Sequence, residues 1–95
     1  MFTWLNKTGV QSDRGFVVQS MDRLSIDYRE GTRKVNVYVE RGFAGGKPCV
    51  IIEAGAFERW DGDPTSATLP TEKQQEMLAN FKEAMEFQGI EVLVG

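Results

Sequence analysis

Apolar and polar positions alternate along the first two thirds of the chain, and this period of two is typical of half-buried β-strands. The alternation is clearest over residues 23–29 and 33–41. Glu30-Gly31-Thr32 joins these two segments, and glycine supplies the positive φ that a tight hairpin turn often needs. We therefore expect a β-hairpin here, with the three valines of the second strand on its buried face.

Shorter patterns predict further strands. Apolar clusters indicate short strands at residues 2–5, 15–19 and 57–60. The run Cys49-Val50-Ile51-Ile52 is apolar throughout, as expected of a central strand that is buried on both faces. The glycine-rich segment 42–48 is interpreted as a loop.

The hydrophobic period changes in the last third of the chain. Apolar residues recur every three or four positions from Thr71 to about Gln88, which predicts an amphipathic helix. Thr71 and Gln74 have the spacing of a capping box, and Gly89 is placed to end the helix in a left-handed conformation. An alternating segment at residues 90–94 predicts a final strand.

These patterns together predict a single α+β domain over residues 1–95. We expect a mainly antiparallel β-sheet with β-hairpins, one long C-terminal amphipathic helix packed on the sheet, and a final short strand. No apolar run reaches the roughly 20 residues that cross a bilayer, so no membrane association is expected. The lone Cys49 has no partner for a disulfide, which favours a reducing compartment and predicts a cytoplasmic protein.

Charge is distributed unevenly along the chain. The formal net charge is −3, with +3 in residues 1–50 and −6 in residues 51–95. An acidic balance argues against sequence-independent binding of nucleic acid. The exposed hairpin face, with Arg33, Lys34, Asn36 and Tyr38, offers few cations and one aromatic ring, so nucleic acid is an unlikely partner.

Residues that carry chemistry are scarce. The chain has no histidine, and Cys49 therefore has no imidazole to activate it. Glu58, Asp61 and Asp63 offer oxygen ligands, but Pro64 interrupts the alternate spacing that a calcium loop requires. We expect no enzymatic activity, no cofactor and no bound metal.

Trp60 has two interpretations. It lies at the end of an apolar segment, where it can close the hydrophobic core. Alternatively, it shapes a contact surface with the carboxylates beside it, because aromatic residues in a charged surround often anchor interfaces. On the second interpretation Glu58, Trp60, Asp61 and Asp63 are the expected partner-binding residues.

The chain from Val50 onward resembles a known family. An apolar strand is followed by Trp60-Asp61-Gly62-Asp63-Pro64, a helix opens at Leu69-Pro70-Thr71-Glu72-Lys73, and its end reads Glu83-Ala84-Met85-Glu86-Phe87-Gln88-Gly89-Ile90-Glu91-Val92. With preceding β-hairpins, this resembles the small immunity proteins of bacterial polymorphic-toxin and contact-dependent inhibition systems, of a mostly-β type with a Trp-Pro signature.

The resemblance implies a stoichiometric inhibitor that binds and neutralises a cognate protein toxin. Many such toxins are nucleases with basic substrate surfaces, and carboxylates placed against such a surface mimic phosphate and speed association. The alternative from another class is a small nucleic-acid-binding or regulatory module that uses the basic hairpin face. The toxin's activity and the oligomeric state are left open by the sequence.

Overall fold

The computed structural model describes residues 1–62 and 67–95. This part of the chain has an α+β fold that is mainly β, as the sequence predicts. The elements in chain order are β1 (Phe2–Asn6), β2 (Gly9–Ser12), β3 (Phe16–Ser20), β4 (Ser25–Glu30), β5 (Arg33–Tyr38), β6 (Glu40–Ala44), β7 (Lys47–Ile52), α1 (Thr71–Phe87) and β8 (Glu91–Val94).

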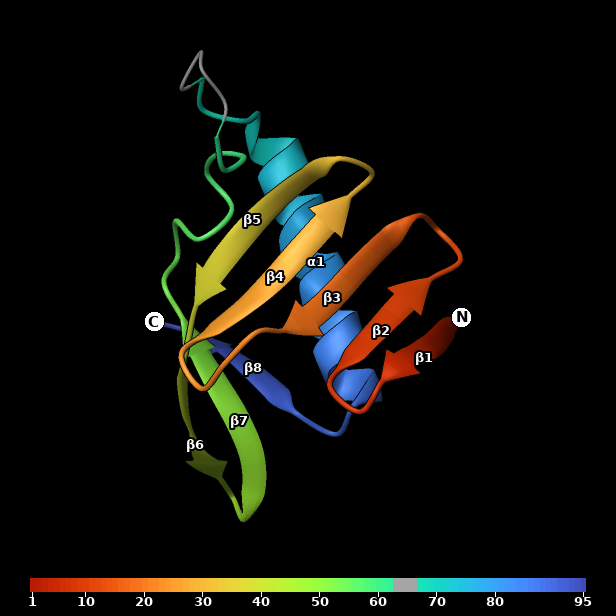
Figure 1. Cartoon of the computed structure of the whole chain (residues 1–95). Helices are drawn as coiled ribbons and strands as arrows, with labels where there is room; N and C mark the ends of the chain where they lie inside the picture. The colour runs from red at the N-terminus through yellow and green to blue at the C-terminus, as the bar shows by residue number, and fades with distance from the viewer. Residues whose placement is uncertain (63–66) are drawn as a thin grey trace.

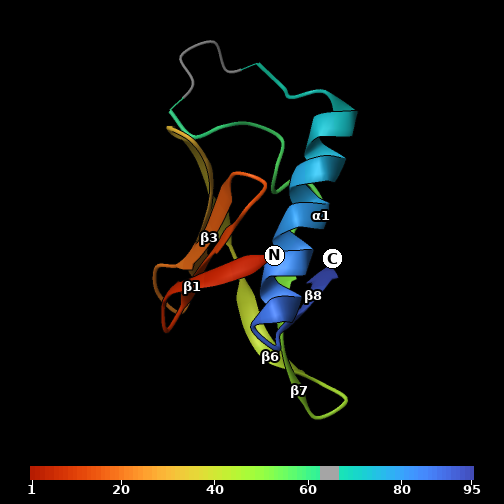
Figure 2. The same cartoon turned by 90° about the vertical axis from the view of Figure 1, so that its right-hand side faces the viewer.

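The first five strands form one sheet in the order β1-β2-β3-β4-β5, with every neighbouring pair antiparallel. Helix α1 lies across one face of this five-stranded sheet, so that the two elements form two layers (Figures 1 and 2). The other face of the sheet points away from the helix. The two layers enclose the hydrophobic core.

The last three strands form a second sheet in the order β6-β7-β8. The pair β6–β7 is antiparallel and the pair β7–β8 is parallel. Only Val39 separates β5 from β6, and its backbone N–H donates to the carbonyl of Leu24 at 2.8 Å. One nearly continuous extended segment therefore passes from one sheet to the other. The end of the β6–β7 hairpin extends beyond the helix and the five-stranded sheet (Figures 1 and 2).

The core contains a group of mutually packed aromatic rings. Tyr28 stacks on Phe16 with ring centroids 5.7 Å apart and makes an edge contact with Phe57 at 5.6 Å. Phe57 in turn contacts Phe81 of the helix at 5.5 Å. Since Phe81 is fully buried, these contacts join the helix to the five-stranded sheet through residues from three separate parts of the chain.

The structure confirms the central hairpin and the helix. Strands β4 and β5 pair from Ser25–Tyr38 to Glu30–Arg33, and Gly31 in the turn has φ of +62°. At the C-terminal end of helix α1, Gly89 has φ of +81°, the left-handed conformation that the sequence predicts. The N–H groups of Gly89 and Ile90 donate to the carbonyls of Glu86 and Met85, which completes a Schellman motif.

The predicted capping box is wrong. The residue that precedes the helix is Pro70, Thr71 is already helical, and no side chain accepts a capping hydrogen bond. A capping hydroxyl must belong to the non-helical residue before the first turn, and proline has no such group. The side-chain amide of Gln74 instead donates to the carbonyl of Leu69 at 2.7 Å.

Three predictions about strands also need correction. Residues 57–60 form a turn and a bend and not the predicted strand, because they pair with no strand. Phe57 and Trp60 are nevertheless buried. Residues 42–44 and 47–48 belong to strands, so the loop is confined to Gly45-Gly46, whose positive φ values allow a tight turn. Strand β7 is central in its sheet as expected, but Ile51 on its outer face is 38% exposed.

Candidate functional site

The segment 53–62 leads from β7 along the outer edge of β5. The backbone N–H of Asp61 donates to the carbonyl of Lys34 at 2.8 Å, and the N–H of Asn36 donates to Oδ2 of Asp61 at 2.7 Å. Asp61 thus satisfies backbone groups that an edge strand otherwise leaves unpaired. Its carboxylate has a structural role whether or not it also meets a partner.

Trp60 belongs to the core. Trp60 is 6% exposed, and its indole stacks on the ring of Tyr28 with centroids 6.4 Å apart and an interplanar angle of 18°. This location agrees with the interpretation of Trp60 as a residue that closes the core. The buried indole offers little area to a partner in this structure.

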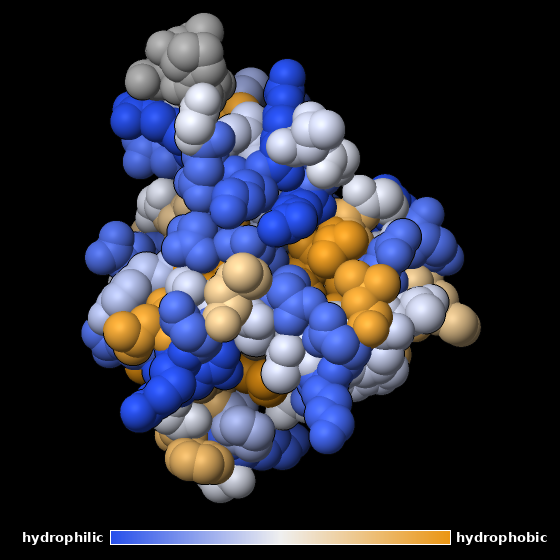
Figure 3. Space-filling view, in the orientation of Figure 1, coloured by the Kyte–Doolittle hydropathy of each residue, from blue (hydrophilic) through white to orange (hydrophobic). Residues whose placement is uncertain are grey.

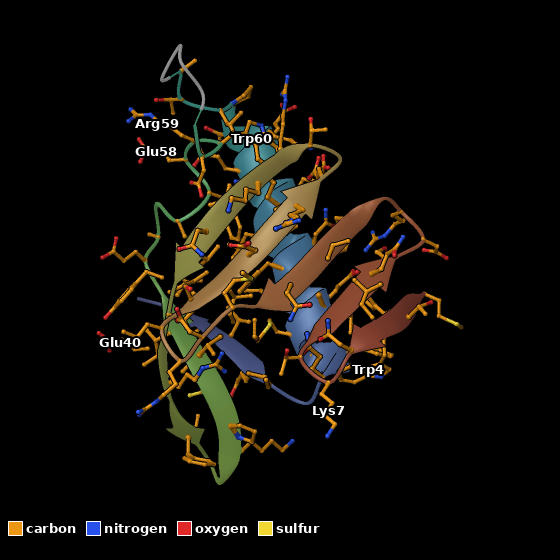
Figure 4. The ribbon with its side chains drawn as sticks, viewed as in Figure 1. Trp4, Lys7, Glu40, Glu58, Arg59 and Trp60 are labelled. Carbon is orange, nitrogen blue, oxygen red and sulfur yellow. The ribbon has the colours of Figure 1, made fainter. Side chains whose placement is uncertain are left out.

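Glu58 is exposed, as is Asp61, but its side chain makes a different kind of contact. Its carboxylate lies 4.0 Å from the guanidinium of Arg59, and both side chains are about half exposed. Figure 4 shows Glu58 and Arg59 on the same flank of the molecule. Asp63 lies outside the residues that the structure describes. The role of Glu58, Trp60, Asp61 and Asp63 in binding a partner stays a prediction.

A second surface was not found from the sequence. On the outer face of the three-stranded sheet, Ile51 pairs with Glu40 of β6 on one side and with Leu93 of β8 on the other. Tyr38, which is 56% exposed, and Glu53 line a shallow hollow of about 140 Å³ next to Ile51. We refer to Tyr38, Glu40, Ile51, Glu53 and Leu93 as the acidic flank.

The carboxylates of the acidic flank form no ion pair with the part of the chain that the structure describes. Within residues 1–62 and 67–95, no Lys or Arg nitrogen lies within 4.0 Å of the carboxylate of Glu40 or Glu53. Glu91, two residues before Leu93 on the same strand face, likewise forms no ion pair with the described residues. Figure 4 shows that Glu40 projects toward the same side of the molecule as Glu58. Exposed apolar side chains are therefore bordered by negative charge that the described chain does not neutralise.

The pairing of residues 40–44 with residues 47–52 as a hairpin is the signal in the sequence that could have revealed this surface. Glu40 and Ile51 become neighbours only when β6 and β7 pair as a hairpin. The glycine-rich pattern of residues 42–48 indicates a loop instead of paired strands, and this interpretation conceals the register. Cross-strand neighbours follow from register, not from proximity in sequence.

The basic hairpin face is partly neutralised. Asp27 is 1% exposed and lies on the face of the five-stranded sheet that points away from the helix. Its carboxylate accepts a hydrogen bond from the side chain of Asn36 at 2.8 Å and lies 3.8 Å from Nζ of Lys34 and 3.5 Å from the guanidinium of Arg29. This face is largely hydrophilic (Figure 3), but two of its cations already have an anionic neighbour.

A polar network joins the helix to strand β4 of the five-stranded sheet. Nζ of Lys73 lies 2.7 Å from Glu30, and this hydrogen bond raises the pKa of Lys73. Tyr28 donates to Glu30 and accepts from Asn80 at 3.0 Å. Burial of the Tyr28 hydroxyl is the largest cause that raises its pKa well above the ordinary value. These contacts connect helix α1 to strand β4.

Two further properties of the described chain concern metal ions and membranes. In the described ranges 1–62 and 67–95, no group of three or more Cys, Asp or Glu side chains is placed to hold a metal ion. The described residues contain one helix, α1. It lacks the length and apolar character that a membrane span needs.

Comparison with known proteins gives no relative. No family model matches the chain, and neither the curated proteins nor the solved structures include one that is significantly similar to it.

Proposed function

We propose that this protein is an immunity protein that binds a cognate bacterial toxin stoichiometrically and neutralises it. The observation that carries the proposal is the acidic flank, where Ile51 and Leu93 are exposed side by side and Glu40 and Glu53 border them without a counter-ion in the described chain. The resemblance of the segment from Val50 onward to immunity proteins supplies the class of partner.

The composition of the flank supports binding to a protein. Protein interfaces combine a desolvated apolar centre, often with tyrosine, and a polar rim. Ile51 and Leu93 are each 38% exposed on neighbouring, hydrogen-bonded strands of the three-stranded sheet, and Tyr38 is 56% exposed beside them. Little reorganisation is needed to present these side chains, which lowers the cost of binding.

The charge of the flank favours a basic partner. Pairing two copies of this surface would bring Glu40 and Glu53 toward like charges, which is unfavourable. A nuclease surface that binds phosphates is basic and complements the unpaired carboxylates. Covering such a surface would block the toxin's access to its substrate, and electrostatic attraction would accelerate the encounter.

The test starts from the gene next to the one for this chain, which the proposal predicts to encode a toxin domain. Wild-type protein is expected to bind it at one-to-one stoichiometry and abolish its activity. The double variant Glu40→Lys/Glu53→Lys is expected to associate at least about tenfold more slowly at low salt, because rim charges act mainly on the association rate. The matched control is Glu72→Lys/Glu86→Lys, which changes the net charge equally at two exposed helix positions.

A third variant, Glu58→Lys, tests the surface that the sequence predicts. Unchanged association for Glu40→Lys/Glu53→Lys, together with loss of binding for Glu58→Lys, would move the interface to the 53–62 segment. Equal effects of the flank variant and the helix control would show that net charge alone matters, and would contradict the proposed surface.

A further inference from the structure

A separate cleft lies at the other end of the molecule from Glu58. It is about 460 Å³ in volume and is bounded by the β1–β2 turn, the loop before β4, strand β6 and the end of helix α1. Figure 4 shows two of its residues, Trp4 and Lys7, below the five-stranded sheet and near the last turn of the helix. Its volume is within the range of small-molecule sites, which is roughly 300–1,000 Å³.

The cleft is positively charged on a protein whose net charge is −3. Lys7, Arg23 and Arg41 line it, and none of the three forms an ion pair with a carboxylate in residues 1–62 or 67–95. Asp22 is the acidic residue among those that line it. Its carboxylate already accepts hydrogen bonds from the N–H of Leu24 at 2.8 Å and from the hydroxyl of Ser25 at 3.2 Å.

Arg41 gives the cleft a fixed shape. Its Nε donates to the carbonyl of Arg23 at 3.1 Å, and a terminal nitrogen lies 3.5 Å from the carbonyl of Asp22. These contacts hold the loop before β4 against β6. The remaining N–H groups of Arg41, and those of Lys7 and Arg23, have no protein acceptor in the described chain. Arg41 is therefore a positioning residue that also contributes donors.

The cleft also has an apolar part. Trp4 is 49% exposed, and its indole contacts Phe87 with ring centroids 5.6 Å apart. Met21, which is 54% exposed, and Ile90 lie on the same lining. The indole thus retains exposed surface in a cleft that also presents cationic donors. An exposed aromatic ring is a stacking platform for a planar group.

We propose that this cleft binds a small organic anion that carries a planar ring, of which a nucleoside monophosphate is the representative chemistry. The anionic group accepts hydrogen bonds from the side-chain N–H groups of Lys7 and Arg23, since ammonium and guanidinium groups form strong charge-assisted hydrogen bonds with phosphate or carboxylate. The ring packs on Trp4 and Met21. This inference does not rest on the acidic flank or on toxin binding, because it uses other residues and the opposite charge.

The experiment titrates the full chain with adenosine monophosphate, adenosine and inorganic phosphate. Binding is followed by amide chemical shifts and by tryptophan fluorescence, in which Trp4 is the exposed reporter and Trp60 is buried. Adenosine monophosphate is expected to give saturable shifts in the turn 7–8, the loop 20–24 and the helix end. Adenosine and inorganic phosphate, which each lack one half of the ligand, are expected to bind at least about tenfold more weakly.

Two charge-matched variants separate a specific site from general electrostatics. Lys7→Gln/Arg23→Gln is expected to weaken binding at least about tenfold, whereas Lys47→Gln/Lys82→Gln is expected to bind like wild type. Circular dichroism and thermal unfolding show whether each variant is folded. The variant Trp4→Phe is expected to keep partial affinity, because a smaller ring remains.

Several results would overturn the proposal. These are no saturable shift with adenosine monophosphate, equal weakening by both double variants, and equal affinity for adenosine and its monophosphate. Tighter binding of a glutamate-rich peptide than of adenosine monophosphate would also overturn it, since the cleft would then be a docking site for an acidic protein segment.

Discussion

Asp61 and Asn36 are joined across 25 residues of sequence by a hydrogen bond in which the backbone N–H of Asn36 donates to the Asp61 carboxylate at 2.7 Å. A second bond, from the N–H of Asp61 to the carbonyl of Lys34 on the same strand, is 2.8 Å long. The pair anchors the segment 53–62 to the edge of β5. A residue that the sequence suggests as part of a binding surface is therefore also part of the fold.

Replacing Asp61 by Ala is expected to destabilise the protein by about 1 kcal/mol, because one charge-assisted hydrogen bond is lost at an exposed edge. Urea denaturation measures the change. The matched control is Glu58→Ala, whose carboxylate forms an exposed ion pair with Arg59 and no other ion pair within residues 1–62 and 67–95. Its free energy of unfolding is expected to change by less than about 0.5 kcal/mol. Equal effects of the two substitutions would contradict the anchoring role of Asp61.

Phe81 provides a test of the core between the helix and the sheet. Its side chain is fully buried and contacts Phe57. Phe81→Ala is expected to lower the free energy of unfolding by about 3–5 kcal/mol, through lost burial and a residual cavity. Phe87→Ala, on the same helix but 43% exposed, is expected to cost much less. A similar loss for both variants would show that the helix packs on the sheet in another orientation.

The network of Tyr28, Glu30 and Lys73 predicts destabilisation in alkali. Burial raises the pKa of Tyr28, and the hydrogen bond with Glu30 raises the pKa of Lys73. A raised folded-state pKa gives stability that is fully present below the unfolded pKa and is lost as the pH rises above it. The unfolded values are near 10.0 for tyrosine and 10.5 for lysine.

Thermal unfolding between pH 8 and pH 11, about the range that spans these values, is expected to show a falling melting temperature. The variant Tyr28→Phe is expected to be less stable than wild type by roughly 1 kcal/mol at neutral pH, where the hydroxyl bonds with Asn80 and Glu30 are lost. Its alkaline decline is expected to be shallower than that of wild type. A parallel decline in both proteins would contradict the assignment to Tyr28.

The lowered pKa of Asp22 predicts the opposite pH dependence, a loss of stability in acid. The hydrogen bond from the N–H of Leu24 is the largest cause that lowers the pKa of Asp22 below 3.8. A lowered pKa gives stability that is present above the unfolded value and is lost as the pH falls through the folded one. Carboxyl titration by nuclear magnetic resonance should give a value for Asp22 below 3.8. A value above 3.8 would show that the turn at residues 22–25 is not held as described.

The sequence was most informative where one regular pattern acts locally. The alternation over residues 23–41 and the three- and four-residue period of the helix reflect side-chain direction within one element. The hairpin β4–β5 and helix α1 were predicted for this reason. Strand β2 was missed because Gly9–Ser12 holds one large apolar residue, Val10, and depends on pairing with both of its neighbours.

Tertiary neighbours account for the rest of the differences. The sequence left open whether Trp60 lies in the core, and its contact with Tyr28 depends on the path of a turn that has no periodic pattern. The acidic flank depends on the register of β6, β7 and β8, which come from two distant parts of the chain. The cleft around Trp4 depends on four elements that meet in space.

The central claim is that the chain neutralises a toxin by binding it, and one measurement tests this directly. Purified protein is titrated into the toxin domain that the proposal predicts to be encoded beside its gene, and complex formation and toxin activity are followed in the same samples. We predict that activity falls to zero at one equivalent, and that Glu40→Lys/Glu53→Lys at low salt requires more time or more protein to reach the same inhibition. Full toxin activity in the presence of several equivalents of folded wild-type protein would contradict the claim.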